Sequence, residues 1–185
     1  DEVRVVLRLP KTERDHLPDL ENLVILTPSG RRAMLGEVAH LQHGQSYSRI
    51  RRVDAATGVI TTVAGDGTAG YRGDGGPGPQ ARMREPNDCF PDGAGGLLIA
   101  DIQDQRVRRL DLRSGNISTF AGTGEKARVG DGGPATQAGI NGARAVCGDG
   151  QGNIYICERE GNSMRKVDGG GTITTVSGTG ETGYS

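Results

Sequence analysis

The string Gly73–Pro77, G-D-G-G-P, returns as Gly130–Pro134, and the 57-residue spacing between the two copies decides the fold. The same shift places Arg49–Asp54 on Arg106–Asp111, and 21 of the 57 positions from 49 to 105 are identical to their counterparts. A shortened third copy follows, so that about 2.4 periods are present. Repetition at a fixed period of this length is typical of propellers and other repeat folds.

Each period contains the signals of four short strands. Val59–Ala64 and Ile117–Ala121 are rich in β-branched residues and end at glycine, whereas Leu97–Asp101 and Ile154–Glu158 each follow a D-G-x-G hairpin turn. One loop of about 20 residues, Gly65–Glu85, interrupts the otherwise short connections. We therefore predict an all-β chain, a partial β-propeller of about 2.4 blades with four antiparallel strands each.

Two details of these strands depart from a simple pattern. Ile50 and Val53 lie three residues apart, as do Val107 and Leu110, where a half-buried strand would space them by two. We interpret this spacing as a β-bulge. Pro91 lacks a backbone donor, which leaves the pairing of its strand open and favours a strand end.

Composition agrees with turns between short strands. The chain has 32 glycines in 185 residues, and only three of them precede residue 49. The formal net charge of −1 indicates no general attraction to nucleic acid or to an anionic membrane. The three cysteines, Cys89, Cys147 and Cys157, show no metal-ligand spacing. We predict that Cys147 and Cys157 are small buried side chains.

The repeats resemble NHL repeats, a family of six-bladed β-propellers. The resemblance rests on Arg106–Asp111, Ile117–Gly124, Gly130–Thr136 and Asp149–Ile156, and covers residues 49–185 as repeats 49–105, 106–162 and a partial 163–185. It implies a non-catalytic binding or scaffold module located outside the cytoplasm, in the periplasm, on the cell surface or secreted. Some propellers of this type are hydrolases or lyases with a metal in the central channel, which keeps an enzyme as an alternative. Of the residues expected to line that channel, Asp88 alone is a carboxylate.

Residues 1–48 do not share the period, and we predict a small α+β segment there. This segment resembles part of the periplasmic porter domain of resistance-nodulation-division efflux pumps, on Glu2–Val5, Leu20–Gly30 and Leu35–Ala39. A transporter fragment is therefore a third functional alternative, although no membrane span is predicted. We expect this chain to be a piece of a longer protein. The change of family falls on the short string Ser48–Asp54, so we hypothesise a chimeric reading frame, which amplification across codons 40–60 from source DNA tests.

Two sets of residues are candidate sites. The glycine-rich loops could hold a ligand through backbone amides and a carboxylate, or they could be tight turns in which aspartate accepts local backbone bonds. This ligand-loop set is Asp74, Gly75, Gly76, Asp131, Gly132 and Gly133. A basic stripe could instead bind an anionic partner, or its charges could pair with neighbouring aspartates on a solvated edge. This stripe is Arg51, Arg52, Arg108, Arg109, Arg165 and Lys166.

No catalytic set, cofactor or metal is predicted. No nucleophile lies in a pattern with a base and an orienting group, and His40 and His43 lack a third ligand nearby. No aromatic side chains alternate with the basic residues to stack bases, so a nucleic-acid partner is not expected. The expected partner is a protein or a small ligand bound by the loops that connect the blades.

Overall fold

The computed structural model describes residues 24–26, 32–34 and 48–183 of the chain. It divides into two units, residues 1–44 and 45–185. In the first unit, β1 (Val24–Leu26) pairs with β2 (Arg32–Met34) as an antiparallel hairpin. The first of these strands lies within the strand expected at 23–27, whereas the expected helical turn at 12–15 is outside the described residues.

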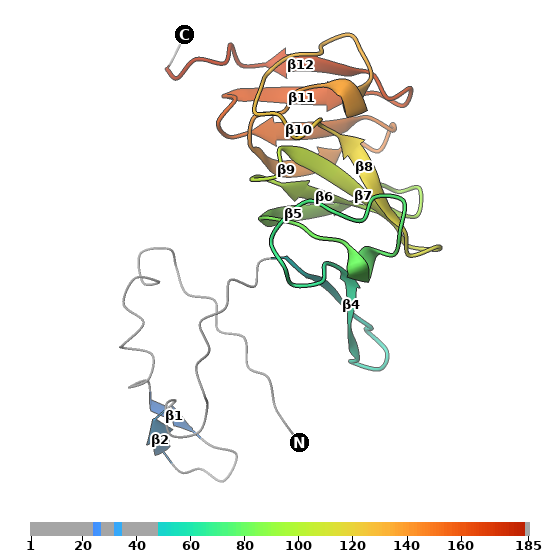
Figure 1. The fold of residues 1–185 in the computed structure, drawn as a ribbon, viewed down its shortest axis with the longest axis vertical. Coiled ribbons are helices and arrows are strands. Elements are labelled where there is room, and N and C mark those ends of the chain that lie inside the picture. The colour runs from blue at the N-terminus through green and yellow to red at the C-terminus, as the bar shows by residue number, and fades with distance from the viewer. Residues whose placement is uncertain (1–23, 27–31, 35–47, 184–185) are drawn as a thin grey trace. The chain divides into compact units, whose positions relative to one another are not determined.

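The second unit consists of three antiparallel sheets that follow one another along the chain (Figure 1). A two-stranded sheet comes first, β3 (Ile50–Val53) with β4 (Ile60–Ala64). The second sheet has the order β5 (Pro86–Pro91), β6 (Gly96–Asp101), β7 (Arg106–Asp111) and β8 (Ile117–Ala121). The third has the order β9 (Ala143–Gly148), β10 (Ile154–Glu158), β11 (Ser163–Val167) and β12 (Ile173–Ser177). The described residues thus form the predicted all-β, partial propeller.

The blades are offset from the sequence repeats. A repeat that begins at Arg49 contains the two outer strands of one sheet and the two inner strands of the next, because the long loop divides it in the middle. Each complete blade therefore draws strands from two consecutive repeats. The inner strands β5 and β9 lie next to each other: Asn87 Nδ2 donates to the Arg144 carbonyl at 2.8 Å, and Val146 N–H donates to Asp88 Oδ2 at 3.0 Å.

Both faces of the middle sheet are covered by apolar side chains. One cluster joins β3–β4 to this sheet and includes Met83, Ile99 and Leu110. A larger cluster joins it to β9–β12 and includes Leu98 and Val107. The spacing of three between Val107 and Leu110 therefore reflects burial on opposite faces, and strict alternation is absent because neither face meets solvent.

The predicted bulge is confirmed at the same place in all three sheets. The pairing register shifts between Ile50 and Arg51, between Val107 and Arg108, and between Met164 and Arg165. The strand of Pro91 also forms, with this proline at its end opposite Leu97. By contrast, the prediction that Cys147 and Cys157 are buried is wrong. Both are exposed, because no further sheet in the described part of the chain covers β9–β12.

The long loops lie along the outer edge of the blade that follows them. Gly75 N–H donates to the Ile117 carbonyl at 2.7 Å, and Ile117 N–H donates to the Gly76 carbonyl at 2.9 Å. Gly132, Gly133 and Ile173 repeat this pair of bonds at 2.8 and 3.0 Å. Each loop contains one short 3-10 turn, η2 (Gly78–Gln80) or η3 (Ala135–Gln137). The loops therefore add a short extra strand to β8 and β12.

We expect Gly78→Ala to lower the free energy of unfolding by about 1–3 kcal/mol, the usual cost of overpacking. A Cβ at Gly78 would lie 2.4 Å from the Val63 carbonyl oxygen and 2.6 Å from Leu110 Cδ1. In the next repeat the counterparts of Gly78 and Leu110 are Ala135 and the smaller Val167. The double variant Gly78→Ala/Leu110→Val should thus be less destabilised than the sum of its single variants. Urea unfolding measures this, with Gly169→Ala as the control because its Cβ would meet nothing within 4 Å.

Candidate functional site

Each complete blade contains one fully buried arginine on its third strand. Arg108 of β7 and Arg165 of β11 are both 0% exposed. An ionised guanidinium is stable in such a place only when a carboxylate and further acceptors surround it. The bulge immediately before each arginine sets the direction of its side chain relative to the preceding residue.

In both blades the carboxylate comes from the preceding long loop. Asp74 forms a salt bridge with Arg108, and Asp131 Oδ1 lies 2.7 Å from Arg165 Nη2. The sequence predicted these aspartates and arginines as members of two separate sites, and the structure brings them together in pairs. We call each pair with its threonine partner on the fourth strand an Arg–Asp socket: Arg108, Asp74 and Thr119, or Arg165, Asp131 and Thr175.

Backbone carbonyls complete the surroundings of the arginine in each Arg–Asp socket. Arg108 Nη1 donates to the Arg82 carbonyl at 2.8 Å, and its Nη2 donates to the Arg72 carbonyl at 3.3 Å. Arg165 donates to the carbonyls of Gly139 and Val129, both at 3.3 Å. These four carbonyls lie at matching positions in the two loops, since 72 and 82 become 129 and 139 after the shift of 57. The loop thus supplies most of the acceptors around the buried charge.

Asp74 is held by the strand as well as by the arginine. Its Oδ2 accepts bonds from Thr119 N–H at 2.8 Å, from Thr119 Oγ1 at 2.5 Å and from Tyr71 Oη at 2.8 Å. Burial by itself raises the pKa of Asp74, but the hydrogen bonds from Thr119 and Tyr71 and the charge of Arg108 outweigh it and leave the pKa below its usual value. The donor Thr119 is 45 residues away in sequence, so the expectation of local backbone bonds to Asp74 is wrong.

The glycines of the ligand-loop set are engaged within the chain. Gly73 and Gly130 adopt φ of +92° and +93°, and a Cβ there would lie 2.9 and 2.8 Å from the Cα of Ala81 and Ala138. The amides of Gly75 and Gly132 bond to the outer strand, and those of Gly76 and Gly133 bond to the Gly73 and Gly130 carbonyls. These loops are thus tight turns with positive φ whose amides already have partners.

The members of the basic stripe lie in three different environments. Arg108 and Arg165 are buried, whereas Arg51 and Arg52 are exposed on β3. Arg109 Nε lies 2.5 Å from Asp92 Oδ2 in the turn before β6, and Lys166 is half-buried on β11. Charge pairing with aspartate occurs as expected, but the strongest pairs lie inside the blades and not on a solvated edge. The members therefore form no continuous exposed surface.

A second group of buried charges lies beside Arg108. Asp101 accepts backbone bonds from Arg84 at 2.8 Å and Glu85 at 2.9 Å, and Asp104 is buried near it. Burial and the nearby charge of Asp101 raise the pKa of Asp104 to about 6. In the third sheet, Glu158 takes the place of Asp101 and lies 3.5 Å from Arg165 Nη1. Sequence reasoning missed these acids, although their recurrence 57 residues apart was a usable signal.

Catalytic and metal-binding groupings were sought among residues 48–183 as well. Within the described part of the chain, no three His, Cys, Asp or Glu side chains lie close enough to hold a metal ion. Asp88, the carboxylate predicted to face the channel, accepts the Val146 amide that links β5 to β9. No helix among the described residues has the length and apolar character of a membrane span.

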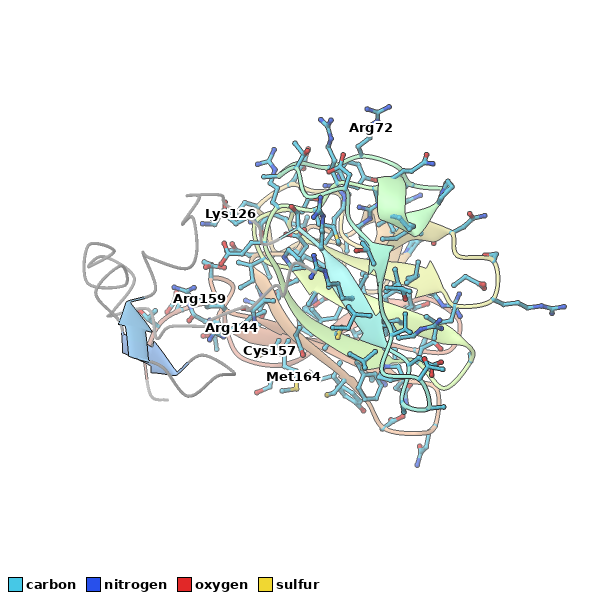
Figure 2. The ribbon with its side chains drawn as sticks, turned by 90° about the horizontal axis from the view of Figure 1, so that it is seen from below. Arg72, Lys126, Arg144, Cys157, Arg159 and Met164 are labelled. Atoms are coloured by element: carbon cyan, nitrogen blue, oxygen red, sulfur yellow. The ribbon has the colours of Figure 1, made fainter. Side chains whose placement is uncertain are left out.

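The most exposed parts of the two long loops are their first halves. Thr68, Ala69 and Arg72 are exposed in the first loop, as are Glu125 and Lys126 in the second. Figure 2 shows Arg72 and Lys126 directed away from the sheets. A hollow of about 390 Å³ lies on the first loop, lined in part by Asp66, Arg72 and Gln80. These loops thus offer a polar surface outside the Arg–Asp sockets.

Comparisons with known proteins support the fold. The chain matches no sequence-family profile. It is 36% identical over 96 residues to teneurin-3 of Danio rerio and 37% identical over 95 residues to teneurin-1 of Gallus gallus. These matches cover 45% and 44% of the chain but only 4% and 3% of those proteins.

Two solved structures from Bacteroides thetaiotaomicron share the architecture. A protein of unknown function matches with a TM-score of 0.56 and 24% identity, over 66% of this chain and 30% of that one. An auxiliary nutrient binding protein matches with a TM-score of 0.51 and 20% identity, over 83% and 37%. The chain therefore spans about a third of these structures, and the likeness shows that its repeats form part of a β-propeller.

We expect Arg108→Met and Asp74→Asn each to lower the free energy of unfolding by about 3–5 kcal/mol, the usual effect of removing one partner of a buried ion pair. The double variant should cost at least about 1 kcal/mol less than the sum, because the two side chains act on each other. Chemical denaturation at pH 7 measures both quantities. The exposed Arg113 provides the control Arg113→Met, which should change stability by less than about 0.5 kcal/mol. Strictly additive losses at Arg108 and Asp74 would contradict the assigned pairing.

Asp104 predicts a gain in stability on mild acidification. Because its pKa is about 6 in the folded chain and about 4 when unfolded, the folded state binds the proton more tightly and gains stability as the pH falls from 7.5 to 5. The full difference is about 3 kcal/mol once the pH is below both values. Asp104→Asn should remove most of this dependence, as measured by urea unfolding at both pH values. Glu125→Gln, at an exposed position, should leave it unchanged.

Proposed function

We propose that this chain is part of a non-catalytic binding propeller whose two long loops recognise a protein partner. One observation carries the proposal: the anchors of the loops are the same in both repeats, while their exposed tips differ. Asp74 and Asp131 are held by the same residue types at the same positions. Between β4 and this anchor, the exposed Thr68–Ala69 of one loop becomes Glu125–Lys126 in the other.

A fixed anchor with a varied tip is suited to recognition. Binding residues are commonly found on loops that a rigid scaffold positions, since the scaffold limits the entropy lost on binding. The Arg–Asp socket and the pairing with β8 or β12 restrict each loop on both sides of its glycine turn. One of the similar structures is an auxiliary nutrient binding protein, which supports a binding role and makes a small ligand the second type of partner to test.

Three further assignments are proposed on the sequence pattern. Residues 49–185 are NHL-type repeats of an extracytoplasmic protein, and residues 1–48 derive from a porter-type segment. The complete open reading frame tests both origins: further 57-residue periods support the first, and twelve membrane helices downstream would favour an efflux transporter instead. Fractionation of the source cells tests the location.

We expect a photo-reactive residue placed at Ala69 or Lys126 to crosslink the same partner in an extract of the source cells. The matched control is Arg113, an exposed residue in the turn between β7 and β8, which should give no such product. Mass spectrometry identifies the partner, and Lys126→Glu should weaken its capture. Equal crosslinking from Arg113 would contradict the proposal. A stoichiometric transition metal in the full-length protein would favour a propeller enzyme.

A further inference from the structure

The first sheet contains two of the three residues of an Arg–Asp socket. Arg51 lies opposite Thr62 in the pairing of β3 with β4, as Arg108 lies opposite Thr119 and Arg165 opposite Thr175. The bulge that precedes each arginine is also present, between Ile50 and Arg51. The backbone of this hairpin therefore has the same register as the two blades whose sockets are occupied.

The aspartate is missing from this third copy. The position 57 residues before Asp74 is Leu17, so the sequence supplies no acid there. Arg51 is exposed, and no carboxylate among the described residues lies within 4 Å of it, whereas Arg108 and Arg165 are completely buried beside theirs. The cationic half of the site is present without its anionic half.

The apolar side chains beside Arg51 are uncovered in the same way. Val53 and Ile60 are 59% and 58% exposed, while their counterparts Leu110 and Ile117 are 1% and 0% exposed. In the middle sheet, the loop that supplies Asp74 also supplies Ala81 and Met83 to the cluster around Leu110 and Ile117. A loop segment on β3–β4 would thus cover apolar surface and neutralise Arg51 at the same time.

Strand β4 also offers the matching backbone groups. Gly75, Gly76 and Gly78 bond to Ile117 and Gly115 at the outer edge of β8, at distances of 2.7 to 2.9 Å. The equivalent residues of the first hairpin are Ile60 and Gly58, at and just before the start of β4, which is one edge of a two-stranded sheet. Addition of an extended segment to a sheet edge is a common mode of peptide recognition.

We propose that the β3–β4 hairpin is a docking site for a separate polypeptide segment of the G-D-G-G-P type. The aspartate of that segment binds Arg51 and Thr62, its glycine amides pair with Ile60 and Gly58, and its apolar residues cover Val53 and Ile60. A second copy of this chain is a poorer occupant, because its own Asp74 and Asp131 already bind Arg108 and Arg165. This surface is distinct from the loop tips of the proposed function and does not depend on them.

The probe is a synthetic peptide with the sequence of residues 71–85, YRGDGGPGPQARMRE, added to the complete 185-residue chain. Fluorescence anisotropy measures its affinity. We expect Arg51→Met to weaken binding about tenfold or more, since a charge-assisted hydrogen bond is lost. A peptide with asparagine in place of its aspartate should bind the wild type equally weakly, and the two changes together should cost no more than either alone.

The matched control is Arg52→Met, the neighbouring exposed arginine on β3, which lies opposite Thr61. It should change the affinity less than about twofold, because its side chain points to the other face of the sheet. Equal weakening by Arg51→Met and Arg52→Met would overturn the proposal in favour of unspecific charge attraction. Unfolding transitions equal to that of the wild type will show that both variants are folded.

Amide hydrogen exchange locates the bound peptide. Protection of residues 58–62 on addition of the peptide is expected, and protection elsewhere in its place would overturn the proposal. Absence of binding at millimolar peptide would also overturn it. Self-association that Arg51→Met abolishes, without peptide binding, would show that a second copy is the occupant.

Discussion

The structure depends on a buried guanidinium that its own blade cannot neutralise. Arg108 and Arg165 lie on the third strand of a blade, completely out of contact with water, and the cost of burying such a charge is several kcal/mol. Their acceptors are one aspartate and two carbonyls of the loop that precedes the blade. The path of a loop of about 20 residues is thus tied to one side chain. This tie explains why the loop remains close to the sheet despite having few apolar residues of its own.

The same loop joins two neighbouring sheets. Gly78 is buried between Val63 of β4 and Leu110 of β7, and Ala81 and Met83 belong to the apolar cluster between the sheets. Electrostatic and apolar contributions are therefore arranged on one segment, with the carboxylate on the edge strand and the apolar residues between the blades. Where the loop is missing from the described residues, at β3–β4, both contributions are missing together. The exposure of Arg51, Val53 and Ile60 is the result.

Most of the architecture could be predicted from the sequence, and the candidate sites could be predicted only in part. The strands, their hairpin turns and the bulge before Arg108 all follow from local patterns that repeat at 57 residues. The pairing of Asp74 with Arg108 also leaves a signal, because Asp, Arg and Thr recur together in the two occupied copies and the aspartate alone is missing from the first. Burial could not be predicted: an Arg beside an Asp is equally compatible with a solvated strand edge. The exposure of Cys147 and Cys157 was missed for a related reason, since an apolar position is covered only when another sheet lies against it.

The sequence by itself determined the repeat, the number of strands per period and the residues that need a left-handed backbone, because these depend on spacing and on local steric limits. Only the tertiary structure decided where one blade ends and the next begins. A period of 57 can be divided at any residue, and the division is made by which strands share hydrogen bonds. The tertiary structure also decided that the two predicted sites are one, since Asp74 and Arg108 are 34 residues apart and meet only when the loop lies along the edge of β8.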